Sequence, residues 1–315
     1  LYWGQLESGA LILSDNATSF DSLQISTLSQ RWPWLFRYLG ALKAETFVSR
    51  VSNDRGNPHE WYSGLRLGTT PFDLFEMNLS FVYQFGGDRS ENGSFSDTLV
   101  EILGGRTETG SGIHDVTSIT NRSVSLDMRL NLDSLAWPTA VYWENYLEDC
   151  CGTMTDILKK SYGYGVGVLT QLGHEEKSHR LRLEYVRLPN TAYWNGTRTD
   201  GWTNDRRVFG SPVGRDSDRV LFVWSKVIRD FQLKFSSLLQ RSLRTGELVR
   251  GEIRTTFPRF ATEYRWGQQL GFRWDLNDRI SIDSQFAYSY IRNRNNLSGS
   301  SSNEWGQIIR TEWRF

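Results

Sequence analysis

Histidines are the first residues of this sequence that could act as general bases, and there are four of them. His59, His114, His174 and His179 all fall in or beside expected loops and turns. A hydrolase needs a nucleophile, a base and an orienting group close together. None of the four histidines lies on a strand beside a candidate serine, so the sequence predicts no catalytic residue and a protein that is not an enzyme.

Carboxylates and cysteines offer two further kinds of chemistry. Glu144 and Glu148 share one face of an expected strand and could in principle cleave a glycosidic bond, although interior salt bridges explain them more simply. Cys150 and Cys151 are adjacent, which is neither a metal-ligand spacing nor a redox CxxC motif. In an oxidising envelope they could form a strained vicinal disulfide or pair with a residue outside the chain, and a local structural role is expected rather than a redox function. No metal and no cofactor are expected.

Residues 189–218 form a long expected loop in which aromatic and polar side chains gather. Aromatic rings can stack on the apolar faces of sugars, while Asn, Asp and Arg bind hydroxyls or uronic carboxylates. The alternative is that these residues belong to an interfacial aromatic girdle and to ordinary loop packing. The candidate glycan-binding residues of this loop are Tyr193, Trp194, Asn195, Arg198, Asp200, Trp202, Asp205 and Arg206.

Amphipathic strands are the elements that must position this loop. At the C-terminus, alternate residues from Trp305 to Phe315 are mostly apolar, and those between them, such as Arg310 and Glu312, are mostly charged. A last amphipathic strand that ends in phenylalanine is typical of bacterial outer-membrane barrels. Period-2 patterning predicts the clearest strands at residues 75–85, 123–132, 162–172, 180–188, 219–228, 231–240, 264–274, 280–291 and 305–315, and weaker ones at 9–14, 22–30, 38–51, 61–68 and 140–148.

The connections between these strands distinguish a barrel from a soluble sandwich. Read back from the C-terminus, long connections such as 293–304 and 241–263 alternate with short ones such as 275–279 and 229–230. Outer-membrane barrels have long extracellular loops and short periplasmic turns. The sequence therefore predicts an all-β transmembrane antiparallel barrel of about 14 strands, several of them about 10–12 residues long, as a tilted span requires. Residues 95–103 are expected to form a short helix or plug.

Composition permits this fold and excludes others. The chain is only 38% hydrophobic and 23% charged, which also fits a barrel because only every second strand residue must face lipid. No run approaches the roughly 18–20 apolar residues of a spanning helix. The 36 basic and 36 acidic residues cancel, so nothing indicates nucleic-acid binding. The aromatic content of 14% fits interfacial girdles, although a carbohydrate-binding sandwich would use such residues too.

Several segments resemble one known family in the same order along the chain. Residues 2–5 (Tyr-Trp-Gly-Gln) and 11–17 (Leu-Ile-Leu-Ser-Asp-Asn-Ala) are similar to the Trp-Gly-Pro and Leu-Ile-Leu-Ser-Asn-Asn-Ala motifs of the Wzi-type capsule assembly family, with Gln5 in place of proline. Residues 193–201 and 210–217 resemble a Gly/Tyr-rich loop and the Gly-His-x-x-Gly-x-Asp-like turn after it, whose histidine is absent here. Residues 125–129 and 142–149 resemble its central strands.

This resemblance implies an outer-membrane barrel of up to about 18 strands, preceded by a small periplasmic helical part. Such a protein attaches or organises capsular polysaccharide at the Gram-negative cell surface in a lectin-like way. The chain starts at Leu1 without a signal peptide, so an N-terminal part is expected to be missing, and residues 1–315 are expected to form a single barrel domain. The expected partners are capsular or exported polysaccharide, outer-membrane lipids and lipopolysaccharide, and the barrel assembly machinery, which would bind Phe315.

Charges on the expected inward faces of the strands are nearly balanced in sign. Selective pores usually have one sign in excess, whereas balanced charges pair and fill the interior. The sequence therefore predicts a plugged or narrow lumen, toward which Gly163, Gly165 and Gly167 all face. A porin or an exopolysaccharide export channel is the alternative. The expected lumen charge network consists of Asp127, Arg129, Arg182, Glu184, Arg265, Arg273, Asp283, Arg310 and Glu312.

Overall fold

The computed structural model describes most of the chain. The described residues are 1–17, 21–31, 38–51, 58–88, 120–133, 137–148, 162–173, 178–193, 201–204, 207–228, 230–243, 248–249, 252–253, 261–277 and 279–313. In this part of the chain there is no helix with the length and apolar character that a membrane crossing would need.

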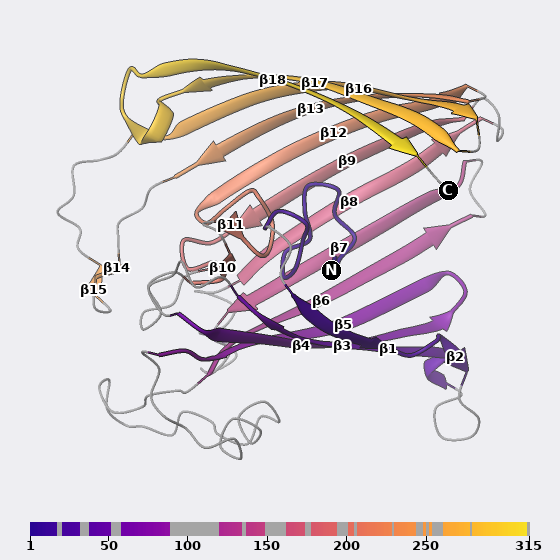
Figure 1. Cartoon of the computed structure of the whole chain (residues 1–315), viewed down its shortest axis with the longest axis vertical. Coiled ribbons are helices and arrows are strands. Elements are labelled where there is room, and N and C mark those ends of the chain that lie inside the picture. Colours follow the sequence, from indigo (N-terminus) through magenta and orange to yellow (C-terminus); the bar gives the residue numbers. More distant parts are fainter. Residues whose placement is uncertain are drawn as a thin grey trace. The chain divides into compact units, whose positions relative to one another are not determined.

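The described chain is an all-β protein built on one large antiparallel sheet (Figure 1). Its fourteen strands are β1 (Ser22–Ser26), β2 (Gln30–Arg31), β3 (Ala41–Arg50), β4 (Glu60–Phe72), β5 (Phe75–Gly86), β6 (Thr120–Leu132), β7 (Thr139–Glu148), β8 (Tyr162–Leu172), β9 (His179–Leu188), β12 (Ser217–Ile228), β13 (Phe231–Ser242), β16 (Glu263–Asn277), β17 (Ile280–Arg292) and β18 (Ser301–Trp313).

The strand order follows the sequence. Each of these strands from β3 onward pairs with the one that precedes it in this series, and β2 pairs with β3 beside β1. Two small hairpins lie off the sheet, β10 (Thr203–Asn204) with β11 (Arg207–Val208) and β14 (Leu248–Val249) with β15 (Glu252–Ile253). A 3-10 turn, η3 (Arg294–Asn296), follows β17. The predicted sheet of about fourteen sequential antiparallel strands is therefore confirmed.

The alternation of long and short connections is also present from β4 onward. Two residues separate β4 from β5, and two more, 229–230, separate β12 from β13, whereas residues 189–216 lie between β9 and β12. One predicted strand is wrong: residues 9–14 form only a single bridge, between Trp3 and Leu13. The chain turns at Gly9, which has a φ of 101° that favours glycine, so these residues cannot extend into a regular strand.

The chain divides into two compact units. Unit 1 contains residues 1–129, 143–164 and 191–215, and unit 2 contains residues 130–142, 165–190 and 216–315, so that β6, β7 and β8 contribute residues to both. In each unit one face of the sheet carries the polar side chains, and we call it the polar face. It carries Asn78, Asp127 and Glu144 in unit 1, and Arg182, Lys234 and Asp283 in unit 2.

In unit 1 the N-terminal segment (residues 1–16) packs against the polar face. Trp3 is buried and meets the ring of Phe47 edge to face, with 5.3 Å between the ring centroids. Gly64 on β4 leaves the space for this indole, because a Cβ there would lie 2.8 Å from it. The strands alternate as predicted: Asn78, Ser80 and Gln84 on β5 are buried on the polar face, and Leu79 and Phe81 face the other way.

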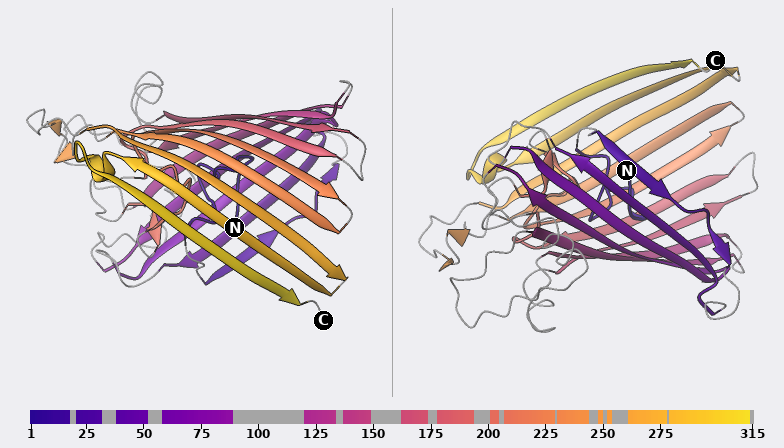
Figure 2. Two further views of the ribbon diagram at one scale, coloured as in Figure 1. Left: turned by 90° about the horizontal axis from the view of Figure 1, so that it is seen from above. Right: turned by 60° about the horizontal axis from the view of Figure 1, so that its bottom comes forward.

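In unit 2 the register aligns apolar side chains across neighbouring strands. One register position across four strands holds Trp224 on β12, Phe235 on β13, Leu270 on β16 and Phe286 on β17. Strands β16, β17 and β18 run side by side at one end of the sheet (Figure 2). The side chains of Trp305, Ile309 and Trp313 on β18 remain 63–69% exposed to solvent. Such a continuous exposed apolar surface is the kind that faces lipid or a partner.

Tyr142 on β7 packs over Gly167 on β8, and this contact gives a testable prediction for unit 2. A Cβ on Gly167 would overlap the phenol ring, which is 2% exposed and whose hydroxyl donates to Glu184 Oε1 over 2.7 Å. We expect Gly167→Ala to lower the free energy of unfolding by about 1–3 kcal/mol, the usual range for overpacking. Urea unfolding in detergent micelles measures this.

Gly306→Ala on β18 is the matched control for Gly167→Ala. An added Cβ at Gly306 meets no atom within 4 Å, so this variant should unfold like the parent protein. Equal stability of the two variants would contradict the packing of Tyr142 on Gly167.

Candidate functional site

Glu144 on β7 holds the N-terminal segment against the polar face of unit 1. Its side chain is fully buried, and one carboxylate oxygen accepts hydrogen bonds from the backbone N–H groups of Gln5 and Leu6, the latter at 2.9 Å. The other oxygen accepts from the N–H of Leu11 at 2.9 Å. A buried carboxylate is tolerated where several N–H groups satisfy it, so Glu144 and the segment depend on each other.

A second buried carboxylate, Asp127 on β6, connects the same segment to β4 and β5. It forms an ion pair with Arg66 at 3.2 Å and accepts a hydrogen bond from Asn78 Nδ2 at 2.8 Å. Gln5 Nε2 also donates to Asp127 Oδ1 at 3.3 Å, and Gln5 Oε1 lies 3.5 Å from Arg129 Nη1. Gln5 therefore contacts two residues of the predicted charge network, Asp127 and Arg129.

Tyr193, at the start of the long loop before β12, is buried between the N-terminal segment and the polar face of unit 1. Its hydroxyl donates to Leu11 O at 2.6 Å and accepts from the N–H of Ser211 at 2.9 Å. Its own backbone N–H donates to Glu148 Oε2, so Glu148 is structural here. Burial away from water raises the pKa of the Tyr193 phenol above its ordinary value, which keeps the hydroxyl protonated.

Trp202 lies later in the same loop and contacts Tyr193. Its backbone N–H donates to Tyr193 O at 3.3 Å, so the two residues on either side of the stretch 194–201 lie close together. The indole is 3% exposed and packs edge to face on Tyr62, with 5.5 Å between the centroids, and Phe209 lies on the same tyrosine at 4.5 Å. Tyr62 in turn donates from its hydroxyl to Gly201 O at 3.2 Å.

Tyr193 and Trp202, two of the candidate glycan-binding residues, are buried in the structure, as the alternative of loop packing expects. Both are buried because the N-terminal segment and β4 supply apolar and hydrogen-bonding neighbours for them. The other candidate glycan-binding residues, Trp194, Asn195, Arg198, Asp200, Asp205 and Arg206, lie outside the described residues. Cys150, Cys151 and the expected short helix at residues 95–103 also lie outside them.

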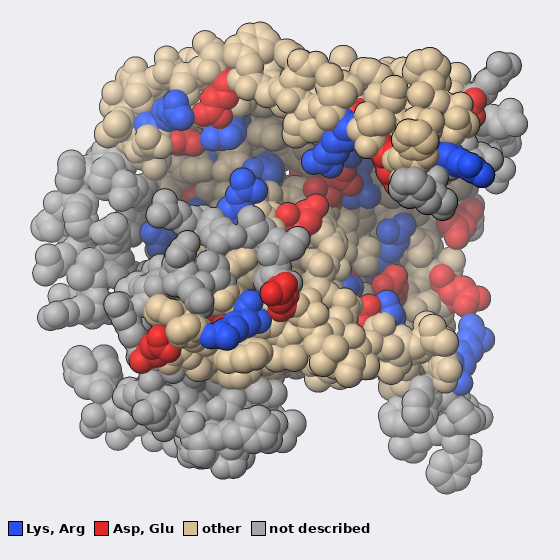
Figure 3. Space-filling view, viewed as in Figure 1, with Lys and Arg blue, Asp and Glu red and all other residues tan. Residues whose placement is uncertain are grey.

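Several members of the predicted charge network pair with opposite charges. Arg182 lies 3.2 Å from Glu184, Arg273 lies 3.4 Å from Glu312, and Arg265 lies 3.7 Å from Glu304. Asp283 and Arg310 are opposite each other in the register of β17 and β18. In Figure 3, acidic and basic side chains are interspersed over the face in view rather than separated by sign.

Sequence reasoning missed a third polar cluster, on β4, β5 and β6. Gln84 Nε2 donates to Glu60 Oε2 at 2.7 Å, and Asn121 Nδ2 donates to Gln84 Oε1 at 3.2 Å, with all three residues buried. Period-2 alternation places these side chains on the polar face, but only the fold brings them together. Of the described histidines, His59 pairs with Asp88 at 2.9 Å, and His179 Nδ1 accepts from Trp224 Nε1 at 3.1 Å.

These observations define a class of protein: one large up-and-down antiparallel sheet with an apolar and a polar face, the wall architecture of outer-membrane β-barrels. The model of the family described as Capsule assembly protein Wzi matches residues 1–304. The chain therefore belongs to this family, and the resemblance seen in its motifs is confirmed.

Two known proteins illustrate the relationship. The solved structure of Wzi from Escherichia coli, described as an outer-membrane carbohydrate-binding β-barrel involved in group 1 capsule assembly, superposes with a TM-score of 0.77 at 17% identity over 99% of this chain. A 55.8 kDa protein encoded in the cps region of Klebsiella pneumoniae is 26% identical over 154 residues, or 48% of this chain. The chain spans 65% of the length of the first protein and the match spans 29% of the second.

Proposed function

We propose that this chain forms the wall of an outer-membrane β-barrel that binds capsular or other exported polysaccharide at the cell surface and acts in capsule assembly. The observation that carries the proposal is the family match over residues 1–304. The apolar faces of the strands and the alternation of long and short connections support a membrane location. The protein would act by binding rather than by catalysis.

The barrel is proposed to have a plugged interior rather than an open pore. Residues 1–16 occupy part of the polar face of unit 1, where Glu144 and Asp127 anchor them. The paired charges on the polar face of unit 2 also support a plugged interior, since a selective pore needs one sign of charge in excess. These features favour an anchoring barrel over a porin or an export channel. Residues 1–315 are proposed to belong to one barrel domain.

The glycan is proposed to bind to the loop between β9 and β12. Tyr193 and Trp202 flank residues 194–200 in the sequence. A backbone hydrogen bond joins these two residues, and the burial of their rings holds them in place. A loop with fixed ends loses less conformational entropy when it binds, which favours affinity. The proposed contacts to sugar rings, hydroxyls and carboxylates come from Trp194, Asn195, Arg198, Asp200, Asp205 and Arg206.

Other partners follow from the same reading. The exposed apolar residues of β13, β16 and β18, such as Leu239, Leu270 and Trp313, would contact outer-membrane lipids and lipopolysaccharide. Phe315 is proposed to be bound by the barrel assembly machinery.

Replacing loop residues should release capsule. In a capsulated strain whose own copy is deleted, we expect the full-length protein to restore cell-bound polysaccharide and the Trp194→Ala/Arg198→Ala variant to fail. Two lost contacts at a binding hot spot should weaken binding of the purified protein to the polysaccharide by roughly tenfold or more. Assays of cell-bound and released polysaccharide, with a binding titration, measure both effects.

Trp137→Ala is the matched control, because Trp137 is an exposed tryptophan in the short β6–β7 connection. It should retain capsule and bind polysaccharide like the parent protein. If the loop variant also does so, the assignment of the glycan to this loop is wrong. If the deletion strain keeps its capsule, the proposed function itself is wrong.

A further inference from the structure

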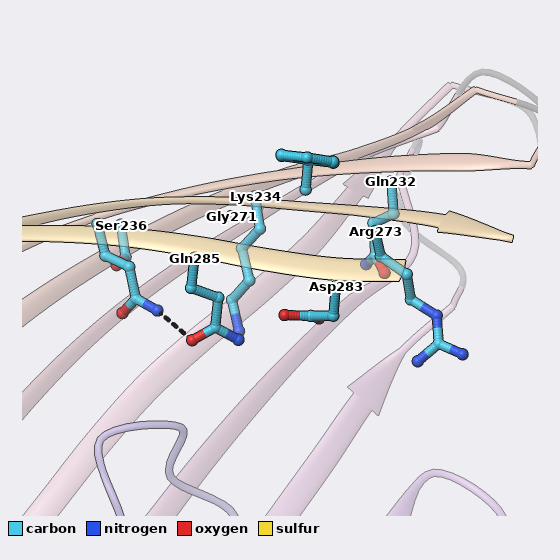
Figure 4. Close-up of a pocket in the computed structure, with 9 residues that line it drawn as sticks. Gln232, Lys234, Ser236, Gly271, Arg273, Asp283 and Gln285 are labelled. Atoms are coloured by element: carbon cyan, nitrogen blue, oxygen red, sulfur yellow. Dashed lines mark hydrogen bonds between the residues drawn. The ribbon is translucent and has the colours of Figure 1, made fainter. Parts of the chain in front are cut away.

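A polar hollow of about 80 Å³ lies on the polar face of β13, β16 and β17 in unit 2 (Figure 4). It lies toward the ends of these strands that the short connections join, at residues 229–230 and 278–279. Its volume has room for several water molecules. None of its described lining residues belongs to the loop between β9 and β12, to which glycan binding is assigned above.

The register places a glycine in the middle of this hollow. Gly271 on β16 lies opposite Lys234 on β13 and Gln285 on β17. A Cβ built on Gly271 would find Gln285 Cγ at 3.7 Å and Lys234 Cβ at 3.9 Å, which are ordinary contacts. The missing side chain therefore leaves the space open, and a Cβ at this position fits without a clash.

The residues around Gly271 form a ring of hydrogen-bonding groups. Gln269 Nε2 donates to Gln285 Oε1 at 2.9 Å, which orients both amides. Asp283 has one buried carboxylate oxygen, Oδ1, that accepts no hydrogen bond from any described residue. A buried acceptor without a partner is costly, so a ligand hydroxyl that reached the Asp283 carboxylate from the hollow would be stabilised there.

The charged residues around the hollow indicate which class of ligand it can bind. Arg273 is held by Asp275 at 3.1 Å and by Glu312 at 3.4 Å, so its positive charge is already compensated. Lys234 and Asp283, both lining residues, bring one charge of each sign. A metal cation would meet the lysine, and an anion would meet the carboxylate. A neutral ligand rich in hydroxyl groups matches amides that both donate and accept and a carboxylate that only accepts.

We infer that this hollow is a second carbohydrate site, which takes the hydroxyl-bearing edge of one neutral sugar ring. The choice of a sugar among neutral polyols rests on the proposed function. The Asp283 carboxylate would accept from a ring hydroxyl, and Gln232, Gln269 and Gln285 would complete the hydrogen bonds. Gly271 admits the ring, so this position determines whether the site binds at all.

Saturation-transfer NMR on the full-length protein in detergent micelles tests this site, with methyl β-galactoside, glycerol and glucuronate as separate probes. We expect transfer to the neutral galactoside, less to glucuronate and least to glycerol. Gly271→Leu should abolish the transfer, and Asp283→Asn should weaken binding about tenfold by removing a charge-assisted hydrogen bond. Gly306→Leu is the control, because it adds the same side chain to open space on β18.

Heat-modifiable electrophoretic mobility checks that each variant is folded, and Gly271→Ala provides a milder second variant. Absence of transfer to the parent protein, or equal transfer to Gly271→Leu and Gly306→Leu, would overturn the inference. Equal or stronger transfer to glycerol or glucuronate would overturn the assignment to a neutral sugar. Trp194→Ala/Arg198→Ala separates the two sites: it should lose polysaccharide binding and keep transfer to the galactoside. If that variant loses neither, the loop proposal fails while the interior site stands.

Discussion

Glu144→Ala should detach residues 1–16 from the polar face of unit 1. The change leaves the backbone N–H groups of Gln5, Leu6 and Leu11 without their acceptor, and Leu6 and Leu11 are fully buried. Each orphaned donor costs about 1–3 kcal/mol, so the segment should leave the interior rather than stay unsatisfied. Limited proteolysis of the protein in micelles should then cleave within residues 1–16, which the parent protein protects.

The same variant tests the plugged interior in planar bilayers. The parent protein is expected to show little or no single-channel conductance, and Glu144→Ala to show larger openings. Glu144→Gln is the control of closest shape: it keeps one acceptor oxygen and should give an intermediate result. Large stable channels in the parent protein would contradict the plugged interior and support the transport alternative. Protection of the segment in Glu144→Ala would contradict its anchoring by this carboxylate.

Asp127→Ala should be the most destabilising change on the neighbouring strand β6. It leaves Arg66, whose side chain is 13% exposed, without its ion-pair partner and removes one of the two acceptors of Asn78 Nδ2, the other being Glu76. An uncompensated buried charge of this kind costs about 3–5 kcal/mol. Urea unfolding in micelles, followed by tryptophan fluorescence, measures the loss in the free energy of unfolding.

The double variant Arg66→Met/Asp127→Leu separates the cost of the lone charge from the value of the pair. Replacing both partners by apolar residues of similar volume is often close to neutral, so this variant should recover most of the lost stability. If it is as unstable as Asp127→Ala, the pair itself stabilises the fold and the explanation from an uncompensated charge is wrong.

The strands of this protein follow from local patterns in the sequence. On β5 and β6, more and less buried residues alternate as period-2 patterning predicts, because side-chain alternation is a property of any extended chain. The same pattern gave a wrong prediction at residues 9–14, where a run of apolar residues resembles a strand but forms only one bridge. There the N–H of Leu11 donates to Glu144 rather than to a neighbouring strand, and Gly9 turns the chain.

The loop before β12 was harder to interpret for a related reason. Tyr193 and Trp202 have the residue types of an exposed sugar-stacking surface, yet both are buried. Their burial depends on Leu11, Tyr62 and Phe209, which are distant from them in sequence or belong to another element. Aromatic rings satisfy either role equally well, so residue type alone could not distinguish stacking on a sugar from packing in the interior.

By itself, the sequence determined the all-β class, the strands, their two faces, the alternation of connections and the family. All of these depend on neighbouring residues or on motifs read in order. Only the tertiary structure decided which polar groups meet: Glu144 with residues 5, 6 and 11, Asp127 with Arg66 and Asn78, and Asp283 with the hollow around Gly271. The physical reason is that a buried polar group must find partners in space, and strand register and packing bring those partners from distant parts of the chain.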